Sequence, residues 1–209
     1  MSLLIAATYI VKPLVRLCVN PKVTGKENFP QNTDSPIILC ANHISNWDPL
    51  VVATIYPREW RFISKSSLFK IPVVGWFMRK IKAIPVDRNS ADVIPLRNAI
   101  SAMEEGQPVV IFPQGRRVMG EPPSPDQAIK GAALMIASTN AVVVPVGIYT
   151  KGYKSGLFRR FYVNIGEPIT SDVYRPILDE GDKATRFERL TEHVFSRICE
   201  LVKENEQNK

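Results

Sequence analysis

Two residues early in the chain have the types and the spacing that proton transfer requires. His43 follows an apolar segment, and Asp48 stands five residues later. Histidine takes and returns a proton near neutral pH. A carboxylate that accepts a hydrogen bond from one ring nitrogen fixes the tautomer and leaves the other nitrogen as a base. A polar pair that merely stabilises a turn explains the same spacing, so further segments have to decide between the two interpretations.

Three such segments follow in order. Residues 83–88 read Ala-Ile-Pro-Val-Asp-Arg, residues 111–117 read Ile-Phe-Pro-Gln-Gly-Arg-Arg, and residues 143–148 read Val-Val-Pro-Val-Gly-Ile. Together with His43 and Asp48 they resemble the four ordered blocks of the glycerolipid acyltransferase family, and within it the 1-acyl-sn-glycerol-3-phosphate acyltransferases. The resemblance runs from Lys22 to Pro168, and the connecting residues 62–76 are also typical of this family.

The resemblance implies an activity and a site. Members of this family move an acyl chain from acyl-CoA or acyl-carrier protein to the sn-2 hydroxyl of lysophosphatidic acid, with the matching His43 and Asp48 as general base and orienting carboxylate. Arg88 and Arg117 match positions that hold the acceptor's phosphate, and a guanidinium suits that task because its planar fork meets phosphate oxygens in pairs. Lys65 and Lys130 are further candidates for the phosphate. For each of the four, an ordinary surface charge is the alternative.

The third block departs from the family's usual Phe-Pro-Glu-Gly-Thr-Arg-Ser. Gln114 replaces the glutamate, which the family uses to position the acceptor; glutamine keeps the length and one acceptor oxygen but loses the charge. Arg116 adds a positive charge near the expected head group, which favours a more anionic acceptor. Gly115 lets the backbone approach a ligand closely, and its neighbouring amides suit an anion.

The sequence predicts neither a covalent intermediate nor a bound cofactor or metal. A thioester is already activated, and no Gly-x-Ser-x-Gly motif is present. The three cysteines, Cys18, Cys40 and Cys199, are scattered and form no metal-binding or disulfide pattern, which favours a reducing compartment. Cys40 is expected to be a buried strand residue, and His193 a surface residue of a helix.

The net charge of +7 indicates an anionic partner. Eight basic residues stand against two acidic ones between Arg58 and Arg88. No nucleic-acid-binding motif accompanies them, so an anionic membrane surface and a phosphorylated substrate are the expected partners, with a solvated basic face as the alternative.

Residues 1–20 are predicted to form a membrane-interface segment, and residues 21–209 the acyltransferase domain. The apolar N-terminal run is shorter than the roughly 20 residues that a bilayer crossing needs, and Pro13 is expected to break its helix. A helix in the bilayer interface, at the cytoplasmic face, fits this pattern; packing on the domain's own core is the equal alternative.

The remaining pattern predicts a single α/β domain with a mostly parallel sheet flanked by helices. Strands are expected at residues 36–41, 61–64, 82–86, 108–112 and 141–148, and helices at residues 47–56, 91–105, 126–138 and 184–206.

Three other functions remain open at this level. Acylation of glycerol 3-phosphate or of another lysophospholipid uses the same chemistry. A thioesterase would use water in place of the acceptor. A non-catalytic lipid-binding accessory protein would explain Gln114, although such a protein has no chemical reason to keep both His43 and Asp48.

Overall fold

The computed structural model describes residues 3–31, 33–56, 58–87 and 93–209. Its strands are β1 (Lys22–Thr24), β2 (Ile37–Ala41), β3 (Arg61–Lys65), β4 (Ile84–Val86), β5 (Val109–Ile111), β6 (Val142–Tyr149) and β7 (Tyr162–Ile165). Its α-helices are α1 (Leu3–Val19), α2 (Asp48–Ile55), α3 (Pro72–Lys80), α4 (Ile94–Glu104), α5 (Gly131–Thr139), α6 (Ser171–Asp179) and α7 (Lys183–Gln207). Short 3-10 helices are η1 (Lys26–Asn28), η2 (Ser66–Lys70), η3 (Pro125–Gln127) and η4 (Lys151–Tyr153).

The described strands form one seven-stranded sheet in the order β1-β7-β6-β2-β5-β3-β4. Every neighbouring pair is parallel except β6 with β7. The predicted α/β class with a mostly parallel sheet is therefore confirmed.

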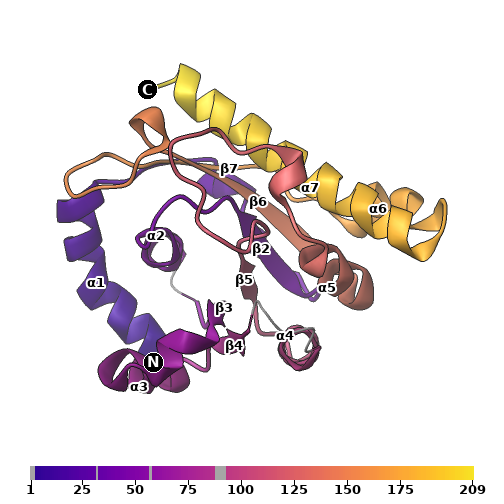
Figure 1. Ribbon diagram of the computed structural model, residues 1–209, viewed down its shortest axis with the longest axis horizontal. Coiled ribbons are helices and arrows are strands. Elements are labelled where there is room, and N and C mark those ends of the chain that lie inside the picture. Colours follow the sequence, from indigo (N-terminus) through magenta and orange to yellow (C-terminus); the bar gives the residue numbers. More distant parts are fainter. Residues whose placement is uncertain (1–2, 32, 57, 88–92) are drawn as a thin grey trace.

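Helices cover both faces of the sheet, as a parallel sheet requires. The side chains of β2 alternate between the two cores: Leu39 packs in the cluster with α1 and α2, and Cys40 packs in the cluster with α4, α5 and α7. Figure 1 shows these two groups of helices on either side of the strands. The sheet thus holds β2 rigidly at its centre.

Helix α1 packs one face on the domain's own core, which was one of the two alternatives, and leaves apolar side chains exposed on another face. Leu4, Val15 and Val19 are buried in the core, whereas Ile10 and Leu17 are more than two thirds exposed. The helix also continues through Pro13, contrary to the prediction. Pro13 lies on the exposed face, where the carbonyl that loses its hydrogen bond can be solvated.

One other prediction was wrong in its bounds, and two strands were not predicted. The expected helix at residues 126–138 begins later, at Gly131, and is preceded by η3. The sequence predicted neither β1 nor β7, which are neighbours in the sheet. No helix in the described part of the chain has both the length and the apolar character needed to cross a bilayer.

Candidate active site

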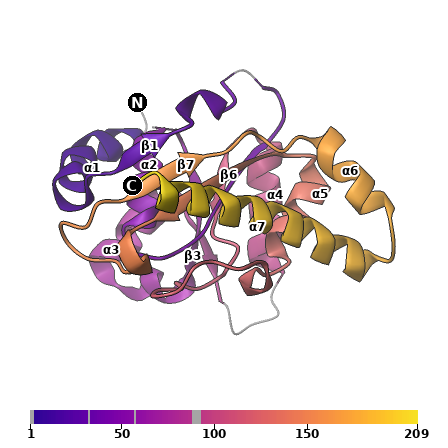
Figure 2. The same cartoon turned by 90° about the horizontal axis from the view of Figure 1, so that it is seen from above.

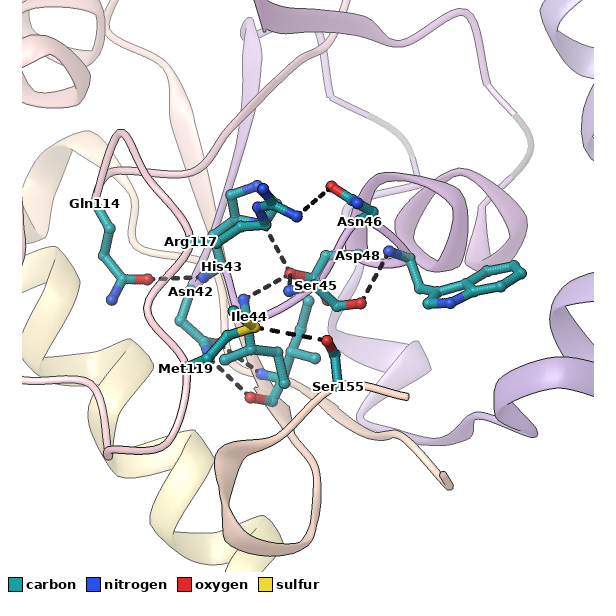
Figure 3. Close-up of polar contacts among 12 residues, drawn as sticks. Asn42, His43, Ile44, Ser45, Asn46, Asp48, Gln114, Arg117, Met119 and Ser155 are labelled. Atoms are coloured by element: carbon teal, nitrogen blue, oxygen red, sulfur yellow. Dashed lines mark hydrogen bonds and ion pairs between the residues drawn. The ribbon is translucent and has the colours of Figure 1, made fainter. Parts of the chain in front are cut away.

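The first, third and fourth sequence blocks meet at the carboxyl ends of the parallel strands. Strands β2, β3, β4, β5 and β6 are mutually parallel, so the segments that follow them emerge at the same edge, where ligands bind in open α/β sheets. His43 follows β2 by two residues, and the loop of residues 112–118 follows β5, the direct neighbour of β2. Figure 3 shows the side chains that meet there.

Asn42 joins the end of β2 to the fourth block. Its side chain is fully buried; its Nδ2 donates to the carbonyl of Ile148 at 2.8 Å, and its Oδ1 accepts from the Ile148 N–H at 2.7 Å. Because both the NH₂ group and the oxygen of its side-chain amide bond to Ile148, Asn42 fixes the main chain immediately before His43.

His43 and Asp48 form the hydrogen-bonded pair that their spacing suggested. The Nδ1 of His43 donates to Oδ2 of Asp48 at 2.7 Å. The same oxygen accepts from the backbone N–H groups of Ile44 and Ser45, each at 2.7 Å. Asp48 is the first residue of α2, followed by Pro49, and the turn before this helix folds the carboxylate back under the imidazole. The other ring nitrogen, Nε2, takes no part in this pair.

The Asp48 carboxyl is completely buried. Burial raises its pKa above the ordinary value, while the hydrogen bonds from His43, Ser45 and Ile44 act in the opposite direction. Its second oxygen, Oδ1, has no hydrogen-bond partner among the described residues. An ionised carboxylate at this position would stabilise a positive charge on His43, but its burial would lower the free energy of unfolding.

The loop after β5 holds His43 at three points. The ring of Phe112 stacks on the imidazole with 4.3 Å between centroids. The His43 N–H donates to Oε1 of Gln114 at 2.7 Å, and the His43 carbonyl accepts from the Val118 N–H at 2.8 Å. The third block therefore fixes both the main chain and the ring plane of His43.

Arg117 and Arg116 lie on the exposed surface of this loop. The Nη1 of Arg117 donates to Oδ1 of Asn46 at 2.7 Å, so Arg117 is tied to the turn between His43 and Asp48 (Figure 3). Gly115, two residues earlier, has a φ of +64°, a left-handed conformation that favours glycine.

Gln114 is turned into the protein. Its side chain is 5% exposed, and its Nε2 donates to Oε1 of Gln127 at 2.8 Å. Gln127 was not predicted from the sequence, and neither was the stacking of Phe112. Phe112 belongs to the third block, two residues before Gln114, so the sequence could have identified it as a site residue. No motif in the sequence marks Gln127.

The other predicted phosphate contacts are placed differently. Lys65 is exposed at the end of β3, opposite Val86 of β4. Arg88, two residues beyond Val86, lies outside the described residues. Lys130 makes an ion pair with Glu188 of α7, so its ammonium group is directed toward that helix.

Other reactive side chains have ordinary surroundings. Cys40 is fully buried, and this burial raises the pKa of its thiol; His193 is exposed on α7. The described residues contain no group of three or more His, Cys, Asp or Glu side chains that could hold a metal.

Comparison with known proteins identifies the family of this chain. The family model described as Acyltransferase matches residues 20–149. A 1-acyl-sn-glycerol-3-phosphate acyltransferase of Bacillus subtilis (strain 168) is 29% identical over 202 residues, which are 94% of this chain and 96% of the relative. One of Brassica napus, the chloroplastic BAT2, is 31% identical over 86% of this chain and 50% of its own length.

The fold also has a solved counterpart. The crystal structure of the 1-acyl-sn-glycerophosphate acyltransferase PlsC from Thermotoga maritima matches with a TM-score of 0.69 and 24% identity, over 96% of this chain and 79% of that one. The family match covers more than half of the sequence and includes the His43–Asp48 pair and the loop that holds it. The chain belongs to the acyltransferase family.

Proposed function

We propose that this protein transfers a fatty acyl group from an acyl thioester to the sn-2 hydroxyl of lysophosphatidic acid, which yields phosphatidic acid. The observation that carries the proposal is the arrangement of His43, whose Nδ1 is held by Asp48 and whose turn is tied to Arg117. The base and the phosphate-binding cation then lie on two adjacent loops, which follow β2 and β5. Relatives named for this reaction support the choice of acceptor.

In the proposed reaction, Nε2 of His43 removes the hydroxyl proton as the oxygen attacks the thioester carbonyl. Asp48 stabilises the resulting imidazolium. The tetrahedral intermediate then collapses, the C–S bond breaks, and the thiolate leaves with the proton that His43 returns. A general base of this kind contributes roughly 10²–10⁴-fold in rate. Acyl-CoA or acyl-carrier protein supplies the thioester, and the reaction requires no metal or other cofactor.

The acceptor's phosphate is proposed to meet Arg117 first. Arg117 is exposed, and Asn46 holds its guanidinium, so little ordering is left to binding. Arg116, Lys65 and Arg88 are proposed as further contacts, and Gly115 as the point of close approach by the backbone. Lys130 is a weaker candidate because Glu188 already pairs with it.

Residues 1–20 are proposed to attach the domain, residues 21–209, to the cytoplasmic face of an anionic membrane. Exposed apolar side chains of α1 lie among the exposed cations Lys12 and Arg16; these apolar residues are Tyr9, Ile10, Leu14 and Leu17. Such a face suits the interface of an anionic bilayer.

A second exposed segment adjoins this helix. Phe158 is 78% exposed, and its N–H donates to the carbonyl of Cys18 at the end of α1. Helix α3, with Val73 79% exposed, lies at the same end of the molecule in both Figure 1 and Figure 2. These three segments support attachment through one end of the protein.

The reaction is tested by mass spectrometry of products formed by purified protein from lysophosphatidic acid and acyl-CoA. We expect phosphatidic acid from the wild type and none above background from His43→Ala, with circular dichroism showing that the variant is folded. Substantial turnover by His43→Ala would contradict the mechanism. Acyl-carrier protein as donor, and glycerol 3-phosphate and other lysophospholipids as acceptors, complete the panel. Free fatty acid without an acceptor would indicate a thioesterase instead.

A further inference from the structure

Backbone donors set the orientation of two side-chain amides at the site, the buried Gln114 and the half-buried Gln127. The His43 N–H can only donate, so Oε1 of Gln114 faces it and Nε2 of Gln114 faces away. Gln127 is oriented in the same manner: the Ser124 N–H donates to its Oε1 at 3.3 Å, within the capping box of η3. Nε2 of Gln114 donates to that same oxygen at 2.8 Å. A directed chain of hydrogen bonds therefore runs from His43 to the loop at Ser124.

A carboxylate at position 114 would match only one end of this chain. One oxygen would accept from the His43 N–H as Gln114 does, but the other would face Oε1 of Gln127, and two acceptors repel each other. Turning the Gln127 amide would relieve that contact and would then place its NH₂ against the Ser124 N–H. An amide, which both accepts and donates, is the group that fits.

We propose that Gln114 and Gln127 act together as positioning residues that fix the main chain of His43, and that Gln114 does not contact the acceptor. On this account Gln114 is matched to Gln127, and it is not a degenerate form of the family's glutamate. The inference rests on the proposed acyl transfer for its kinetic consequences. Its structural consequence, a protected His43 amide, is independent of that activity.

Three variants separate this role from acceptor binding. Gln127→Leu keeps the size of the side chain but removes the acceptor for Gln114, and it should lower kcat about 10-fold, in line with one lost neutral hydrogen bond. Gln127→Glu keeps an oxygen for both donors and suits a capping box. Because Nε2 of Gln127 donates to Oε1 of Glu121 at 3.4 Å, this variant also carries Glu121→Gln, and its kcat should stay close to wild type. Gln114→Glu should also lower kcat. The KM for lysophosphatidic acid should change in none of them.

Hydrogen exchange at the His43 amide gives the second readout. We expect exchange at this amide, relative to amides of the core strands, to be faster in Gln127→Leu than in the wild type or in the variant with Gln127→Glu. Gln207→Leu, an exposed glutamine of α7, is the control for the change of side chain. If the wild type turns over no acceptor, the proposed function fails, and exchange alone still tests the hydrogen-bond chain.

Two results would overturn the inference. One is a Gln114→Glu variant with higher kcat than the wild type together with a kinetically silent Gln127→Leu. The other is a raised KM for lysophosphatidic acid as the main effect of Gln114→Glu, which would return Gln114 to the acceptor site.

Discussion

At the scale of single residues, Asp48 shows how function and stability compete. One oxygen of a fully buried carboxylate receives three hydrogen bonds, while the other receives none from the described residues. Burial without a permanent cation favours the neutral acid, yet the proposed reaction needs the ionised form beside His43. Active sites commonly keep such unfavourable groups at the expense of folding stability.

The Asp48→Asn variant tests this competition. The folded-state pKa of Asp48 is raised above 3.8, so the folded protein holds this proton more tightly than the unfolded chain does. The contribution of this protonated carboxyl to the free energy of unfolding is therefore fully present below pH 3.8, and it is lost as the pH rises through the folded-state pKa. Asparagine does not ionise. We expect a higher melting temperature than wild type at pH 7, with the difference narrowing on acidification.

The same variant should be slow as well as stable. Without the carboxylate charge the imidazolium is not stabilised, and kcat should fall by about 10²–10⁴-fold. Thermal unfolding over a pH series and kcat at pH 7 provide the two measurements. A melting temperature below that of wild type at pH 7, with the deficit shrinking on acidification, would show that ionised Asp48 stabilises the fold.

The sequence predicted the His43–Asp48 pair because its two members are neighbours along the chain and their spacing is part of a family block. It did not predict the direction in which Gln114 points. That direction is set by Gln127 and by the main chain of His43, and these meet only when β5 pairs with β2. Residue type alone allowed Gln114 to face the acceptor equally well.

At the scale of elements, the fourth block owes part of its sequence to helix packing. Gly147 lies in β6 against α7, and an added Cβ would come within 2.7 Å of the backbone carbon of Leu201. Asn205 of α7 also donates to the carbonyl of Gly147 at 3.0 Å. The glycine therefore allows the C-terminal helix to approach the strand whose Ile148 anchors Asn42.

Gly147→Ala should consequently lower the free energy of unfolding by about 1–3 kcal/mol, the usual effect of overpacking. Gly131→Ala is the matched control, because a Cβ there meets nothing within 4 Å and alanine favours the helix that begins at this residue. Urea denaturation of both variants measures the difference. Equal stabilities of the two would contradict the packing argument.

The elements that the sequence predicted are those with strong local signals. The buried run of β2 and the long amphipathic pattern of α7 are examples, and both lie close to their expected bounds. Strand β7 is antiparallel to β6 and only four residues long, so its existence depends on pairing with β6. The passage of α1 through Pro13 likewise depends on which helix face the core covers.

At the scale of the whole molecule, the exposed apolar residues of α1, α3 and the loop at Phe158 are proposed to lie on the membrane together. Ile10→Glu and Leu17→Glu should therefore reduce binding to vesicles that contain phosphatidylglycerol, as measured by flotation. Val173→Glu is the control: Val173 is 47% exposed on α6, which lies toward the opposite end of the molecule in Figures 1 and 2.

The salt dependence belongs to the same experiment. The cations Lys12 and Arg16 attract anionic lipid, so binding of the wild type should weaken as ionic strength rises and the Debye length falls. Equal binding of all the variants, or a loss in Val173→Glu as large as in Leu17→Glu, would place the attachment surface elsewhere.

The hydrogen bonds around His43 differ widely in the length of chain that they span. The bond between His43 and Asp48 joins residues 5 positions apart. The bond from His43 to Gln114 and the bond from Arg117 to Asn46 each span 71 positions, and those between Asn42 and Ile148 span 106. Contacts at large sequence separation require the closure of long loops and form slowly. The hydrogen bond between His43 and Asp48 can therefore form early in folding, before the long-range hydrogen bonds that fix its position. We expect enzymatic activity to return last during refolding, after the helices have formed and the chain has become compact.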